Sequence, residues 1–207
     1  MSGSGGALVL GVGNILWADE GFGVRCVEAF EQRFAPCEQL TVVDGGTQGL
    51  YLVDMLRDHN PVVIFDAVDF GDSPGSLRLV EDDDIPAFVG AHKMSLHQAG
   101  LQDVIACAKL LGGCAANMLL IGVQPVELED YGGSLRPLVR ERIPKALGIA
   151  AAYLAQHDIV LVPGDDTRQG TVITPGLDLA SYEAGRPESS DACRLGDARV
   201  LTRTLKT

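Results

Sequence analysis

The chain has 207 residues, of which 46% are hydrophobic, and a formal net charge of −12. This length predicts one domain with some additional chain, and the acidic balance excludes a basic nucleic-acid or membrane surface, so neither is expected as a partner. No apolar run approaches the ~20 residues that span a bilayer. The five cysteines form no C-x-x-C pair and residues 1–6 carry no basic segment, so we expect reduced thiols, no secretory signal and a cytoplasmic location.

Apolar runs alternate with segments of helical spacing along the first 160 residues. We expect strands at 7–10, 39–44, 61–66, 76–80 and 117–123, and helices at 21–34, about 50–56, 96–111 and 134–155, the last with a kink or break at Pro144. The runs at 61–66 and 117–123 are continuously apolar, which is typical of strands buried on both faces. The pattern predicts an α/β three-layer sandwich, a mostly parallel twisted sheet with helices on both faces.

The chain changes character near residue 163. Residues 1–162 are expected to form the α/β domain, whereas 163–207 are polar, dotted with glycine and without a sustained period. We expect this tail to be disordered or draped over the domain. Its short apolar pairs at 172–173 and 200–201 are candidates for edge pairing with the sheet.

The loop between the first strand and the first helix carries two adjacent acidic residues, Asp19 and Glu20. Carboxylates are favoured at helix N-termini, so capping by Asp19 and a functional role are both open interpretations. Gly11-Val-Gly13 partly matches a dinucleotide-binding loop. Leu16 stands where the third glycine is needed, however, and the two carboxylates would repel a pyrophosphate, so this cofactor is excluded.

Three residues that are far apart in the sequence are expected to meet at one edge of the sheet. Glu20 follows the first strand, Asp66 ends the third and His97 opens the third helix, and ligands of open parallel sheets bind beyond the carboxyl ends of the strands. Two carboxylates and an imidazole suit a divalent transition ion with open positions, although a histidine at a helix start is more often a cap or a surface group. Asp19 and Asp44 should face the same crevice and are the candidate general bases.

Four motifs agree in order and spacing with one known family. The segments Gly11–Gly23, Asp44–Thr47, Asp66–Ala67 and Ser95–Gln98 resemble those of the nickel-iron hydrogenase maturation endopeptidases, over about residues 7–158. The resemblance implies a protease that removes the C-terminal peptide of the hydrogenase large-subunit precursor once nickel is inserted. The version Trp-Ala-Asp-Glu-Gly-Phe-Gly is most similar to the branch that serves membrane-bound uptake hydrogenases.

The same resemblance implies roles for individual residues. Its metal-contacting positions are Glu20, Asp66 and His97, the residues that topology brings together. The nickel is supplied by the substrate rather than held as a resident cofactor, although an open ligand set also accepts other divalent ions. Whether the protease is of aspartic type or metal-dependent stays open.

Two other functions are compatible with the sequence. A nickel-sensing chaperone would bind the large subunit without cutting it, and a hydrolase acting on a small molecule would use the three residues as an acid/base set. Cleavage with purified components excludes the first alternative, whereas metal-independent turnover of a small substrate favours the second.

Overall fold

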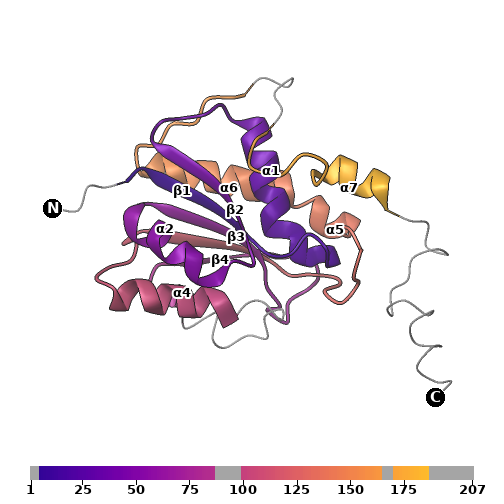
Figure 1. The fold of residues 1–207 in the computed structure, drawn as a ribbon, viewed down its shortest axis with the longest axis horizontal. Coiled ribbons are helices and arrows are strands. Elements are labelled where there is room, and N and C mark those ends of the chain that lie inside the picture. The colour runs from indigo at the N-terminus through magenta and orange to yellow at the C-terminus, as the bar shows by residue number, and fades with distance from the viewer. Residues whose placement is uncertain (1–4, 87–98, 165–169, 187–207) are drawn as a thin grey trace, which may run out of the picture.

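A computed structural model describes residues 5–86, 99–164 and 170–186 of the chain. Within them a five-stranded sheet has the order β2-β1-β3-β5-β4 (Figure 1). Its strands are β1 (Ala7–Val12), β2 (Leu40–Gly46), β3 (Val62–Ala67), β4 (Leu77–Glu81) and β5 (Met118–Val123). The first four in this order are parallel and β4 is antiparallel at the edge, which confirms the expected mostly parallel α/β sheet.

Helices cover both faces of this sheet. The elements are η1 (Ala18–Gly21), α1 (Phe22–Arg33), η2 (Gly49–Leu52), α2 (Val53–Asp58), α4 (Ala99–Leu110), α5 (Pro137–Arg140), α6 (Ile143–Gln156) and α7 (Leu179–Gly185). Helices α1 and α6 lie on one face, and α2 and α4 on the other (Figure 1). No described helix combines the length and the apolar character needed to cross a bilayer.

Alternate residues of the central strands face different helix layers. β1, β3 and β5 are buried along their whole length, as their continuous apolar runs predict. Within β3, Val63 and Phe65 pack in the core beneath α1 and α6, whereas Val62 and Ile64 pack in the core on the side of α2 and α4. This alternation decides which face each polar residue at the end of a strand occupies.

The structure confirms one detailed expectation and contradicts another. The break expected at Pro144 in the helix at 134–155 occurs just before this residue: the segment is divided into α5 and α6, and Pro144 lies in the first turn of α6, where its missing N–H is not needed. No strand forms at 172–173 within the described chain, so the edge pairing expected there is wrong, and 200–201 lie outside the described residues. Residues 170–186 lie against α1 and the loop before α5, and end in α7 (Figure 1).

Candidate functional site

The segment that follows β1 folds back on itself and places Glu20 at the carboxyl end of the strand. Gly13 has φ +136°, and a Cβ there would overlap the Glu20 carbonyl oxygen, so only glycine permits this approach. The Asn14 N–H donates to the same carbonyl at 3.2 Å. A Cβ at Gly23 would overlap the carbonyl oxygens of Val12 and Phe65, so α1 begins directly against the ends of β1 and β3. The tight packing fixes the backbone on both sides of Glu20.

Asp19 holds the loop between β5 and α5. Its side chain is fully buried, and Oδ2 accepts from the Val126 N–H at 2.8 Å and the Glu127 N–H at 2.9 Å. Oδ1 accepts from the Arg136 N–H at 2.7 Å. The residue preceding α1 is Gly21, with no side-chain cap, so the interpretation of Asp19 as a helix cap is wrong. Its role as general base stays a prediction.

Asp66 lies next to the segment that carries Glu20. Both are buried, with 1% and 6% of their surface exposed, and η1 packs against β3. Because Phe65 faces α1 and α6, alternation directs Asp66 to the side of α2 and α4. Asp66 Oδ1 accepts from the Ala67 N–H at 2.7 Å. On this side α4 begins at Ala99, two residues after His97, which itself lies outside the described residues.

Asp44 lies at the same carboxyl edge but on the other face of the sheet. It pairs in register with Gly11 and therefore shares the face of Val9, beneath α1. Oδ1 accepts from the Gly46 N–H at 2.9 Å. Burial raises the pKa of the Asp44 carboxyl, and the Gly46 hydrogen bond and the charge of Arg25 oppose this shift only partly. Asp44 is therefore a stronger base than an exposed aspartate.

The predicted metal ligands are only partly visible. Among residues 5–86, 99–164 and 170–186, no group of three or more histidine, cysteine, aspartate or glutamate side chains is arranged to hold a metal ion. Glu20 and Asp66 offer buried carboxylate oxygens, which suit a divalent cation. His97, the third predicted ligand, lies outside these ranges, so the three-residue set stays a prediction.

Sequence reasoning missed the residue that holds the loop after Asp66. Gln124 follows β5 and is buried, and its Oε1 accepts from the N–H groups of Phe70 at 2.7 Å and Asp72 at 3.2 Å. Its Nε2 donates to Asp69 Oδ1 at 3.0 Å. The only signal in the sequence is the position of this amide directly after a buried strand, at the edge where ligands are expected.

The comparisons with known proteins identify the family. A family model described as hydrogenase maturation protease matches residues 24–153. The chain belongs to this family. It is 54% identical to the hydrogenase expression/formation protein HupD of Thiocapsa roseopersicina, over 94% of this chain and 89% of HupD. The hydrogenase 2 maturation protease of Escherichia coli K12 is 38% identical, over 75% of this chain and 94% of that protein.

Solved structures agree with this assignment. The hydrogenase maturating endopeptidase HybD of Escherichia coli superimposes with a TM-score of 0.73 and 36% identity, covering 78% of this chain and 99% of HybD. The hydrogenase maturation protease HybD of Thermococcus kodakarensis gives a TM-score of 0.59 at 25% identity, covering 70% and 96%. The chain is thus an endopeptidase with the fold of its family, and the resemblance carried by the four sequence motifs is confirmed.

Proposed function

We propose that this protease removes the C-terminal peptide of a nickel-iron hydrogenase large-subunit precursor after nickel insertion, in the cytoplasm. The observation that carries the proposal is a pair of buried carboxylates, Glu20 and Asp66, at the carboxyl edge of the sheet in a chain of this family. The partner is the precursor itself, and the nickel belongs to that substrate.

The carboxylate oxygens of Glu20 and Asp66 suit contact with a metal ion that the substrate already holds. A buried carboxylate lies in a medium of lower dielectric constant than water, where its attraction to a divalent cation is stronger. In the proposal, Glu20 and Asp66, with His97, complete the coordination of the nickel in the substrate. A precursor without nickel makes none of these contacts, so its scissile peptide is not held in place.

The hydrolytic step needs a base to accept a proton from the attacking water. In the proposal this base is Asp44, whose pKa is raised by burial and which accepts a single described backbone hydrogen bond through Oδ1. Asp19 suits the role less well, because both of its oxygens already accept from backbone N–H groups of the loop after β5. The proposal places the scissile peptide across the carboxyl edge of the sheet, between Asp44 on one face and Asp66 on the other. Water adds to the peptide carbonyl, the C–N bond breaks, and the proton passes to the departing amine.

The experiment is incubation of a purified, nickel-loaded precursor with the wild-type protein and with Glu20→Gln, Asp66→Asn and His97→Ala. Intact-mass analysis follows the release of the C-terminal peptide. Arg57→Gln is the control, because its exposed ion pair with Asp54 lies on α2, away from the carboxyl edge.

The wild type and the control should release one peptide, and the three variants should release none. In a separate measurement, the three variants should have the same urea unfolding midpoint as the wild type. Cleavage at the wild-type rate by all three variants contradicts the site. Loss of folded protein in His97→Ala would return that residue to a structural role.

A further inference from the structure

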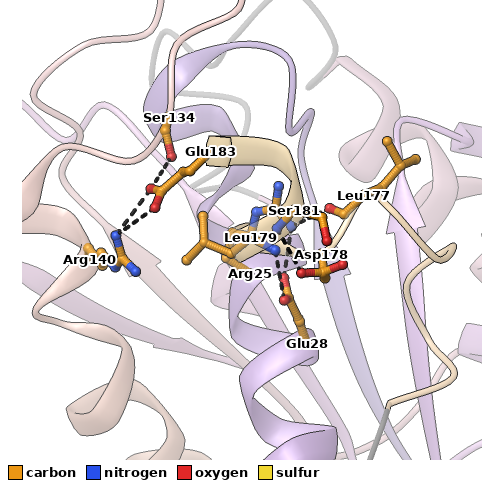
Figure 2. Close-up of polar contacts among 9 residues, drawn as sticks. All are labelled: Arg25, Glu28, Ser134, Arg140, Leu177, Asp178, Leu179, Ser181 and Glu183. Carbon is orange, nitrogen blue, oxygen red and sulfur yellow. Dashed lines mark hydrogen bonds and ion pairs between the residues drawn. The ribbon is translucent and has the colours of Figure 1, made fainter. Parts of the chain in front are cut away.

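A C-terminal segment that lies beyond the family model is bound to α1 through buried polar contacts (Figure 2). Arg25 is 3% exposed, and its Nη1 donates to Glu28 Oε2 at 2.8 Å and to the Leu177 carbonyl at 2.7 Å. Glu28 Oε1 accepts from the Leu179 N–H at 2.9 Å, and the Arg25 guanidinium lies 5.5 Å from the centre of the Tyr182 ring. The start of α7 is therefore fixed on the helix that follows Glu20.

The other side of α7 contacts the loop before α5. We name residues 132–134 the brace turn, because each of them contacts a different side chain of the C-terminal segment. Arg186 Nε donates to the Gly132 carbonyl at 2.8 Å, and the Tyr182 hydroxyl donates to the Gly133 carbonyl at 3.2 Å. The Ser134 hydroxyl donates to Glu183 Oε1 at 2.8 Å, and Arg140 Nη1 lies 3.1 Å from both oxygens of Glu183 (Figure 2).

The brace turn and its neighbours also hold the segment that leads into Glu20. The Gly132 N–H donates to the Leu16 carbonyl at 2.7 Å, so this residue is bound from both sides. The rings of Tyr131 and Trp17 meet edge to face with centroids 5.1 Å apart. The Arg136 N–H, two residues after the turn, donates to Asp19. One short turn thus connects α7 to residues 16–19.

We propose that α7 is a positioning element, which fixes the backbone ahead of Glu20 through the brace turn. The proposal rests on the proposed function in one respect, the engagement of the substrate by Glu20. Catalysis is sensitive to small displacements of such groups, and a loop held from one side only samples more positions than a loop held from both. Tyr182, Glu183 and Arg186 act in this way without contact with the substrate.

Relatives that match nearly the whole chain can carry this C-terminal segment. The HupD proteins of Thiocapsa roseopersicina and Rhodobacter capsulatus match 94% and 96% of this chain, which leaves too few residues to omit 170–186. The match to the Escherichia coli hydrogenase 2 protease leaves a quarter of this chain uncovered, and the family model ends at residue 153. A positioning element that corresponds to α7 is therefore expected in the longer HupD-like proteins.

The test uses the full chain with the double substitution Tyr182→Phe and Arg186→Gln, which removes both bonds to the brace-turn carbonyls at nearly constant size. Arg57→Gln is the matched control, because it removes an arginine contact on the surface of α2. Amide hydrogen exchange is measured in 14–20, in 130–136 and, as an internal reference, in β3. Kinetic constants are measured with the nickel-loaded precursor.

We expect exchange in both loops to accelerate by about tenfold with β3 unchanged, and kcat to fall by about 10- to 100-fold with KM within about threefold of the wild type. Combining Tyr182→Phe with Arg186→Lys, which keeps a donor at position 186, should give a higher kcat than combining it with Arg186→Gln. Unchanged loop exchange overturns the proposal, as does faster exchange throughout β3, which indicates a merely structural role. A rise in KM with unchanged loop exchange also overturns it, because α7 would then contact the substrate instead of fixing the loop. If the wild type does not cleave, the proposed function fails, yet the exchange data still decide whether α7 fixes the loop.

Discussion

Removing the Asp19 carboxylate should destabilise the protein strongly, because three backbone N–H groups depend on it. Asp19 is fully buried and accepts bonds of 2.7–2.9 Å from Val126, Glu127 and Arg136. A donor left without its partner costs about 1–3 kcal/mol, less where water can reach it. Val126 is exposed, so we take the lower part of the range and expect Asp19→Ala to cost about 3–4 kcal/mol in total, out of a typical 5–15 kcal/mol for a domain.

Urea unfolding followed by circular dichroism measures this loss. With a slope of about 2 kcal/mol per M, the midpoint of Asp19→Ala should fall by about 1.5–2 M. Asp19→Asn keeps one acceptor oxygen and should lose about half as much. Asp54→Ala is the control: it removes a carboxylate with an exposed ion pair, and should change the stability by no more than about 0.5 kcal/mol. If Asp19→Ala unfolds at the wild-type urea midpoint and hydrogen exchange at 126–136 is unchanged, Asp19 does not hold this loop.

Three further predictions follow from the packing and charge of single residues. Burial raises the pKa of Asp44, so its stabilising contribution is present below the unfolded pKa and is lost as the pH rises through the folded pKa. Asp44→Asn should therefore unfold at pH 7 at the same or a higher urea concentration than the wild type, yet lose cleavage. Gly23→Ala should cost about 3 kcal/mol in urea unfolding, because its Cβ would overlap backbone carbonyl oxygens. The Cys26 thiol is buried and its pKa is raised, so a thiol reagent should modify it only after unfolding, as peptide mass analysis would show.

Each of these predictions has a specific counter-result. Wild-type cleavage by Asp44→Asn would remove this residue from the mechanism. Gly148→Ala serves as the control for Gly23→Ala, because a Cβ at this exposed position of α6 meets nothing within 4 Å and should stabilise the protein by about 0.5–1 kcal/mol. Equal effects of the two substitutions would contradict the packing argument. Modification of native Cys26 as fast as in urea would contradict its burial.

The sheet could be predicted because its central strands are buried on both faces. β5 and the part of β3 before Asp66 are continuous apolar runs in the sequence, and the structure buries every residue of both strands. A polar residue at the end of such a run, Asp66, lies where the carboxyl ends of parallel strands meet. Topology therefore brought η1 and β3, with Glu20 and Asp66, together without any local motif.

Contacts between side chains and distant backbone groups could not be predicted. Asp19 bonds to N–H groups 107 to 117 residues away, and any residue type except proline supplies such a donor. Arg25 and Glu28 have the spacing of charges on an exposed helix face, yet both are buried beneath the segment before α7. That segment has no sustained apolar period because hydrogen bonds to α1, together with the packing of Val172 and Ile173 alone, attach it to the domain.

The measurement that tests the central claim most directly is intact-mass analysis of the large-subunit precursor, nickel-loaded and nickel-free in parallel, after incubation with this protein. The account predicts loss of one C-terminal peptide from the nickel-loaded form alone. Cleavage of both forms at the same rate would keep the protease and contradict the inspection of nickel by Glu20, Asp66 and His97. Binding of the loaded precursor without cleavage would contradict the proposed reaction itself.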